Sequence, residues 1–139
     1  MRFLVMVKGD AQCEAGVLPS PEMLDRMTRF NEELAKAGVM LAGEGLHPTS
    51  KGARLRWDEG GVTATDGPFT ESKEIVAGFW IISARSKADA IARMRLAPFE
   101  PGAEVEIRPL YEAEEFGDNL TGEVRERSAR VADEIAKRA

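Results

Sequence analysis

The apolar positions of this chain fall into short runs that predict strands, separated by stretches with helical spacing. Residues 3–8 are β-prone and apolar at almost every position, which is typical of a strand covered on both faces. Residues 75–84 hold the most apolar run of the chain and predict a central strand. Residues 104–110 alternate instead, with Val105 and Ile107 on one face, and predict a strand with one polar face.

Helical spacing is clearest between Ser20 and Gly38. Ser20 is a typical N-cap, and the proline and glutamate that follow it suit the first helical turn. Apolar residues then recur at spacings of three and four and form one stripe: Met23, Met27, Phe30, Leu34 and Ala37. Gly38 is the expected end of this helix. We expect a second, shorter helix to begin at Ser86, with Asp89 placed as in a capping box and Pro98 beyond its end.

Two glycines weaken a further strand that is expected at residues 39–46. Gly43 and Gly45 indicate a bulge or a close approach of the backbone to a neighbour. Residues 9–19, between the first strand and the first helix, are expected to form a loop.

The tetrapeptide Asp-Glu-Gly-Gly at residues 58–61 is a hairpin signal between strands expected at 53–57 and 62–66. The elements therefore follow in the order strand, helix, strand, hairpin, strand, helix, strand. With the hairpin treated as an insertion, this is the βαββαβ order of a ferredoxin-like sandwich. The expected fold class is α+β.

The two most apolar strands predict a second copy of the chain. Two helices can cover only one face of an antiparallel sheet. Yet residues 3–7 and 75–82 are apolar on both faces, with Trp80 on one side of its strand and Phe79 on the other. A second copy that packs sheet against sheet would cover the other face, so we expect a homodimer.

Composition narrows the class of protein. The length of 139 residues fits one domain, and a net charge of −5 disfavours a nucleic-acid partner. The single cysteine, Cys13, excludes an internal disulfide and suits a reducing compartment. The apolar run at 75–82 is far shorter than the roughly 18–20 residues that span a bilayer. The apolar stretch at the start of the chain is also too short for the apolar region of a signal peptide. We expect a cytoplasmic protein with no membrane partner.

The composition shifts after Phe116 towards a charged, helix-prone tail. We therefore divide the chain into a domain at residues 1–116 and a helical tail at residues 117–139. The tail carries a thin apolar stripe: Leu120, Val124, Val131 and Ile135. This stripe is compatible with docking on the domain or on a dimer partner, and equally with a solvated appendage.

The segment 66–74 reads Asp-Gly-Pro-Phe-Thr-Glu-Ser-Lys-Glu and leads directly into the central strand. Gly67 supplies backbone freedom and Pro68 fixes φ, which holds Asp66 extended. Ionisable groups beside an apolar strand are the setting in which functional carboxylates arise. The alternative is a plain turn, in which the Asp66 carboxylate accepts hydrogen bonds from backbone N–H groups around Gly67 to Phe69.

This segment resembles the DGPF signature of the YCII-related, DGPF-domain proteins. Three further stretches are similar to the same family and occur in the same order: Gly-Leu-His-Pro at 45–48, Ala-Gly-Phe-Trp at 77–80 and Glu-Ile-Arg-Pro at 106–109. The similarity spans about residues 1 to 116. It implies a dimeric α+β barrel with a pocket between the two sheets.

The resemblance also implies a candidate active site, because a His–Asp pair has been suggested for YCII-like proteins. Asp66 matches the aspartate of the motif, and His47 is the only histidine of the chain. Histidine exchanges a proton readily near neutral pH, so His47 could shuttle a proton with Asp66. The alternative for His47, which precedes Pro48, is an ordinary loop residue.

Six further residues are candidates for ligand binding. They are Phe69, Glu71, Lys73, Phe79, Trp80 and Arg108. Lys73 and Arg108 could grip an anionic ligand, or they could simply pair with neighbouring acids. The aromatic residues could wall a pocket, or they could belong to the core or to an interface.

Several other chemistries find no support in the sequence. One histidine and one cysteine, far apart, give no zinc or iron spacing, and no glycine-rich phosphate loop is present. We expect no metal and no cofactor. The leading hypothesis is binding of a small, polar organic molecule in an intersheet pocket, with proton transfer by Asp66 and His47 of an isomerase, lyase or hydrolase type. The alternative is a non-catalytic ligand sensor or dimeric partner module, and the sequence leaves the choice open.

Overall fold

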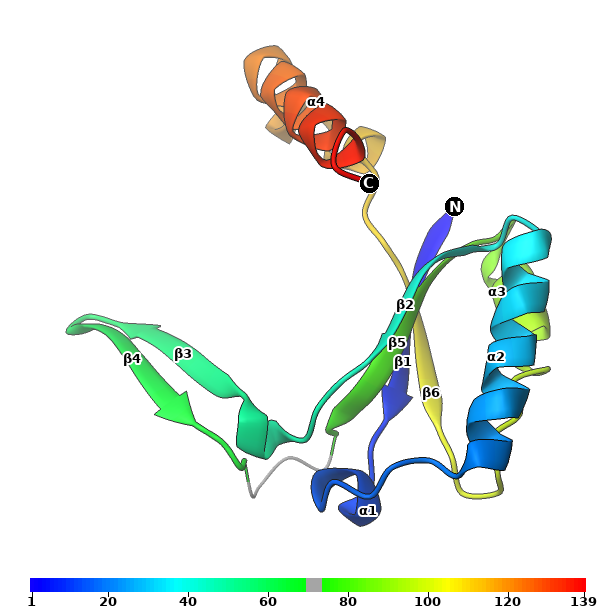
Figure 1. The fold of residues 1–139 in the computed structure, drawn as a ribbon. Coiled ribbons are helices and arrows are strands. Elements are labelled where there is room, and N and C mark those ends of the chain that lie inside the picture. Colours follow the sequence, from blue (N-terminus) through cyan, green and yellow to red (C-terminus); the bar gives the residue numbers. More distant parts are fainter. Residues whose placement is uncertain (70–73) are drawn as a thin grey trace. The chain divides into compact units, whose positions relative to one another are not determined.

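The computed structural model describes residues 1–69 and 74–139 and has an α+β architecture (Figure 1). Its contacts divide the chain into two compact units, Met1–Pro109 and Leu110–Ala139. Four strands of the first unit form an antiparallel sheet in the order β2-β5-β1-β6. These strands are β1 (Arg2–Lys8), β2 (Met40–Gly45), β5 (Val76–Ser83) and β6 (Val105–Pro109).

A hairpin and two longer helices complete the first unit. The hairpin consists of β3 (Ala53–Asp58) and β4 (Gly61–Asp66), which form a separate two-stranded sheet. The helices are α2 (Pro21–Lys36) and α3 (Lys87–Met94), and both lie on the same face of the four-stranded sheet (Figure 1). With the hairpin set aside, the order is βαββαβ, which is compatible with a ferredoxin-like fold.

Local capping explains where the two helices begin. The Ser20 hydroxyl accepts a hydrogen bond from the backbone N–H of Met23 at 3.1 Å, and Gly38 follows α2 with a φ of 71°. The Ser86 hydroxyl accepts from the N–H of Asp89 in the same way. The Asp89 carboxylate accepts from the N–H of Arg85, one residue before the cap, and this bond lowers the pKa of Asp89.

The expected loop at residues 9–19 was an incomplete prediction, because it contains the short helix α1 (Ala11–Glu14). The Asp10 carboxylate caps this helix and accepts from the N–H of Cys13 at 2.9 Å. A second short turn, the 3-10 helix η1 (Thr49–Lys51), follows β2. Both turns contribute to the candidate site described below.

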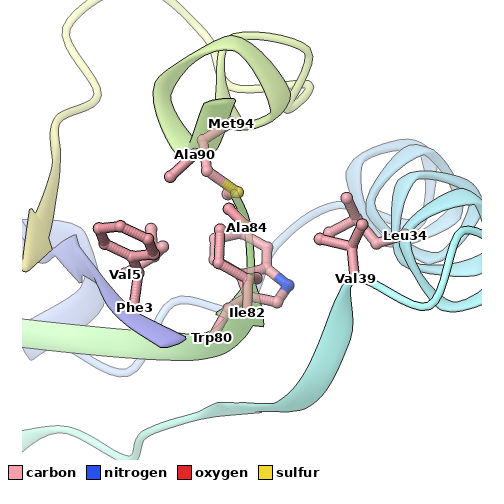
Figure 2. Packing of buried hydrophobic residues seen from close by; sticks show 9 residues of the cluster. All are labelled: Phe3, Val5, Leu34, Val39, Trp80, Ile82, Ala84, Ala90 and Met94. Atoms are coloured by element: carbon pink, nitrogen blue, oxygen red, sulfur yellow. The ribbon is translucent and has the colours of Figure 1, made fainter. Parts of the chain in front are cut away.

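The core lies between the sheet and the helix layer (Figure 2). It is built from alternate residues of β1 and β5, from the inner faces of α2 and α3, and from the residues that flank them. The buried residues are Phe3, Val5, Leu34, Val39, Trp80, Ile82, Ala84, Ala90 and Met94. Burial of such side chains is the main contribution to stability of the fold.

Trp80 joins the two layers. Its indole Nε1–H donates to the Asn31 Oδ1 on α2 at 2.8 Å. Its ring also meets Phe30 and Phe99 edge-on, with centroids 6.0 and 6.1 Å away. On the β2 side, Gly43 leaves room for the indole, since a Cβ there would lie 2.9 Å from Trp80 Cδ1.

Of the two glycines of β2, one marks a close approach of the backbone, as the sequence predicts. Gly43 is a close approach, whereas the register of β2 shifts earlier, between Met40 and Ala42. Gly45 faces open space, because no heavy atom lies within 4 Å of a Cβ built there.

The other face of the sheet carries half-buried apolar side chains. Leu4 and Met6 of β1 alternate with the buried residues of that strand, as do Phe79 and Ile81 of β5. The central strands are thus apolar on both faces, as the sequence predicts. The homodimer that this pattern suggests stays a prediction.

The second unit contains the 3-10 segment η2 (Ala113–Asn119) and the helix α4 (Gly122–Ala136), capped by the Thr121 hydroxyl. The apolar stripe of α4 is exposed: Val131 is 59% and Ile135 is 67% accessible. Among the described residues, no helix combines the length and apolar character that crossing a membrane requires.

Gly43 offers a direct test of the packing around Trp80. In Gly43→Ala, the added methyl would lie 2.6 Å from Met40 Cε and 2.9 Å from Trp80 Cδ1. Overpacking of this kind costs about 1–3 kcal/mol, so we predict that loss in the free energy of unfolding by urea denaturation. Gly45→Ala is the matched control on the same strand and should be neutral or slightly stabilising. Equal effects of the two substitutions would contradict the close approach at Gly43.

Candidate functional site

Asp66 lies at the end of β4, opposite Ala53 of β3, with an exposed side chain. The backbone N–H groups of Gly67 and Phe69 donate to other acceptors. The N–H of Gly67 donates to the Gly52 carbonyl at 3.0 Å, and the N–H of Phe69 donates to the Thr49 hydroxyl at 3.2 Å. The interpretation of Asp66 as a cap of its own turn is therefore wrong, since these N–H groups are already used.

The Asp-Gly-Pro-Phe segment packs directly on η1. A Cβ at Gly67 would overlap the Thr49 carbonyl, so only glycine fits at this position. The Gly67–Pro68 peptide bond is cis. At the base of the hairpin, the Arg54 guanidinium stacks over the Phe69 ring, 3.9 Å from its centroid. Gly67 and Phe69 thus hold the hairpin to η1.

Thr49 is the centre of this arrangement and links it to α1. Its N–H and its hydroxyl both donate to the Glu14 carboxylate, at 3.0 and 2.5 Å. The hydrogen bond from the Thr49 hydroxyl lowers the pKa of Glu14 most, and the bond from the N–H lowers it further. Together they outweigh desolvation, which raises this pKa, so the pKa of Glu14 lies below its ordinary value. Glu14 therefore stays ionised and positions η1 from the opposite side.

A cavity of about 1030 Å³ lies beside this network, within the first unit. It is bounded by α1 and the segment after it, by the first half of α2, by the ends of β2 and β5, and by residues 46–51. Its apolar lining includes Met23, Met27, Phe79, Trp80 and Phe99. Its polar lining includes Cys13, Glu14, Asn31, Glu44, His47 and Lys51.

Three of the eight residues predicted for the site line this cavity: His47, Phe79 and Trp80. His47 is exposed at its rim, between β2 and η1. Trp80 also belongs to the core, which was the alternative given in the sequence analysis for the aromatic residues. The cavity is lined by the helices and the sheet of a single chain, whereas the expected intersheet pocket would need a second copy.

Three predicted residues lie outside the cavity lining. Asp66 and Phe69 are at the base of the hairpin. Arg108 is exposed on β6, opposite Leu4 of β1. The remaining two, Glu71 and Lys73, fall outside the described residues. Glu74, the acid that follows Lys73 in the sequence, pairs with Lys8 at 3.3 Å.

Lys8 forms salt bridges with two glutamates in this region. Its side chain is 14% exposed and lies 3.3 Å from Glu74 and 3.4 Å from Glu106. Desolvation lowers the pKa of Lys8, but the hydrogen bonds and charges of the two glutamates together raise it above its ordinary value. Lys8 thus stays charged and joins β1 to the segment before β5.

Sequence reasoning missed three residues of this region: Glu14, Asn31 and Thr49. Asp10, a typical N-cap, was the local signal for the short helix α1, which carries Glu14. Asn31 sits among charged residues of α2, and only its contact with Trp80 marks it out. Within the described parts of the chain, no three His, Cys, Asp or Glu side chains gather closely enough to hold a metal ion.

Comparison with known proteins identifies the family. A family model of the YCII-related domain matches residues 1–114. The chain belongs to the YCII-related domain family. This confirms the resemblance seen in the sequence, and the match includes all six strands of the first unit.

One protein of known sequence is similar to this chain over 86 residues. It is a protein of Rhizobium meliloti (strain 1021) whose printed name describes it as uncharacterized. The two are 33% identical over 86 residues, which cover 60% of this chain and 69% of the relative. The chemistry of this YCII-related protein therefore has to be argued from its own residues.

The network around Thr49 predicts a pH dependence of stability. The pKa of Glu14 is lowered in the folded chain from its ordinary value of 4.5. Its contribution is therefore fully present above pH 4.5 and is lost as the pH falls through the lowered, folded-state pKa. We predict that the free energy of unfolding of Glu14→Gln falls less steeply below pH 4.5 than that of the wild type. Urea denaturation at a series of pH values measures both slopes.

Glu32→Gln is the control for this experiment, because Glu32 is exposed on α2 and makes no ion pair with another described residue. Its acid slope should match that of the wild type. Identical slopes for Glu14→Gln and the wild type would mean that the Thr49 bonds do not hold the carboxylate.

Proposed function

We propose that this YCII-related protein binds a small organic molecule in the cavity between α1, α2 and the sheet. The cavity carries this proposal. Its volume of about 1030 Å³ is just above the range that small-molecule sites usually occupy, roughly 300–1,000 Å³. Its lining is mostly apolar with a few polar groups, which is the usual composition of such sites.

We further propose that His47 transfers a proton on the bound molecule and that Asp66, which lies outside the cavity lining at the base of the hairpin, assists this transfer. His47 lines the cavity, and histidine both accepts and donates a proton near neutral pH. The segment of η1 connects the two residues, since His47 lies two positions before Thr49 and Asp66 directly precedes Gly67, which binds Gly52. The reaction class would be that of an isomerase, a lyase or a hydrolase.

The lining favours a particular kind of ligand. Aromatic and methionine side chains are part of the lining. Its two acids, Glu14 and Glu44, outnumber Lys51, which is the one lysine or arginine among the described lining residues. A largely apolar molecule with a hydrogen-bond donor or a positive group therefore fits this cavity better than a multiply charged anion.

Gly45 provides a way to block the cavity without disturbing the core. It lines the cavity, and a side chain built there meets no heavy atom within 4 Å. We predict that Gly45→Leu folds but loses the rise in melting temperature that bound compounds produce in the wild type. A thermal-shift screen of small aromatic and aliphatic amines, alcohols and acids provides the compounds. Compounds that stabilise Gly45→Leu as much as the wild type would place the binding site elsewhere.

The proton-transfer role has its own variants. His47→Gln and Asp66→Asn should keep the binding of a compound found in the screen but lose its conversion, followed by NMR of the compound. Typical losses for a general acid or base are about 10²–10⁴-fold in rate. Full conversion by both variants would remove the two residues from the chemistry.

A second candidate function is a non-catalytic ligand sensor or partner module. The exposed apolar side chains of α4, Val131 and Ile135, favour it, because such stripes often mark contact surfaces. A compound that binds in the cavity and is released unchanged, with wild type and variants alike, would support this function over catalysis.

A further inference from the structure

A groove on the helix layer forms a second hollow of the first unit. It has a volume of about 570 Å³ and is lined by one face of α2, by Arg93 near the end of α3, and by Leu96 and Pro98 beyond it. We call it the arginine groove, because its lining includes Arg26 and Arg29 as well as Arg93. No described residue lines both this groove and the cavity of the proposed function. The two hollows are therefore separate.

Helix α2 presents neighbouring faces to the two hollows. Arg26, Phe30 and Leu34 follow one another at spacings of four, so they share a face, and they line the groove. Met23 and Met27 are also four residues apart, but they line the cavity. One helix thus contributes to two places with different chemistry.

The lining of the arginine groove carries an excess of positive charge. Its described residues include three arginines and one acid, Glu33, which pairs with Lys36 at 3.6 Å. The chain as a whole has a net charge of −5. The positive charge is therefore a local feature of this groove, and it favours an anionic ligand.

The three arginines keep hydrogen-bond donors for such a ligand. Their ion pairs are Arg26–Glu100 at 3.0 Å, Arg29–Asp25 at 3.1 Å and Arg93–Asp89 at 3.5 Å. The closest approach in each pair is made by one nitrogen of a guanidinium that carries five N–H donors in all. The first two pairs are exposed, and exposed pairs are weak, so a ligand can compete for these arginines.

The apolar part of the groove is held by the core. Leu34 is one of the buried core residues, and Phe30 packs against the core and meets Trp80 edge-on. Leu96, in contrast, is 76% exposed. A large apolar side chain that is exposed in the same groove as three cations suits a ligand that is itself partly apolar and partly anionic.

We propose that the arginine groove binds a carboxylate with an apolar chain, of the kind found in medium-chain fatty acids. The planar guanidinium groups match a carboxylate in geometry as well as in charge. The chain would lie on Phe30, Leu34 and Leu96. A volume of about 570 Å³ is within the range of small-molecule sites, roughly 300–1,000 Å³. The groove goes beyond the proposed function, because it is a second site with a ligand of opposite charge to the one that suits the cavity.

Octanoate is the probe that tests this proposal. We predict that octanoate, titrated into the ¹⁵N-labelled protein, shifts the backbone amide signals of residues 33–37 and 93–97 in a saturable way. Octan-1-ol and octylamine carry the same apolar chain without the negative charge, so they should bind at least about tenfold more weakly. Gly45→Leu, which fills the cavity, should bind octanoate as the wild type does.

Substitutions of the arginines test the site itself. Arg29→Gln and Arg93→Gln should each raise the dissociation constant of octanoate about tenfold, because each removes a charged donor. Arg95→Gln is the matched control, since Arg95 is exposed, lies two residues from Arg93 and is not among the described lining residues. It should leave the dissociation constant unchanged. Circular dichroism checks that every variant is folded.

Three results would overturn the proposal. The first is a wild type that shows no saturable shift at octanoate concentrations up to the onset of micelle formation. The second is equal binding of octanoate and octan-1-ol, or octanoate binding that both arginine substitutions leave unchanged. The third is loss of octanoate binding in Gly45→Leu, which would place octanoate in the cavity. Binding of amines in the cavity does not enter these comparisons, so the groove and the cavity can fail separately.

Discussion

The contact of Trp80 with its surroundings holds the helix layer at a fixed distance from the sheet. A buried indole needs a partner for its N–H, and Asn31 on α2 provides it at 2.8 Å. The ring needs space on β2, and Gly43 provides it. Phe30 and Phe99 then meet the ring edge-on and extend the core along the sheet. Because Trp80 also lines the cavity, the position of the helix layer and the shape of the candidate site depend on one side chain.

The Asp-Gly-Pro-Phe segment has a structural task that can be separated from any chemistry. Gly67 and Phe69 bind η1, and Thr49 passes this attachment on to Glu14 of α1. Through these bonds the hairpin, the end of β2 and the wall of the cavity are held together. Asp66 is not needed for that attachment, since its carboxylate takes no part in it. The motif therefore combines residues that anchor the hairpin with one carboxylate that remains available for proton transfer.

The sequence predicted those parts of the fold whose causes are local. The strands and α2 follow from apolar spacing and from caps that lie within a few residues of the helix ends. The short helix α1 was missed, because a helix of only four residues is too short to show an apolar stripe. Of the site, His47 could be found by its chemistry alone. Glu14 and Asn31 could not, because their hydrogen-bond partners lie 35 and 49 residues away in sequence and only the folded chain brings them together.

Nuclear magnetic resonance of the two tryptophan indoles tests the central claim, that small molecules bind beside the residue that joins sheet and helices. Trp80 lines the cavity and is 5% exposed, whereas Trp57 is on the hairpin and 72% exposed, so their N–H signals report on different places. On addition of a compound that raises the melting temperature, the Trp80 indole signal should shift in proportion to binding while the Trp57 signal stays in place. A shift of the Trp57 signal with an unchanged Trp80 signal would contradict a binding site in this cavity.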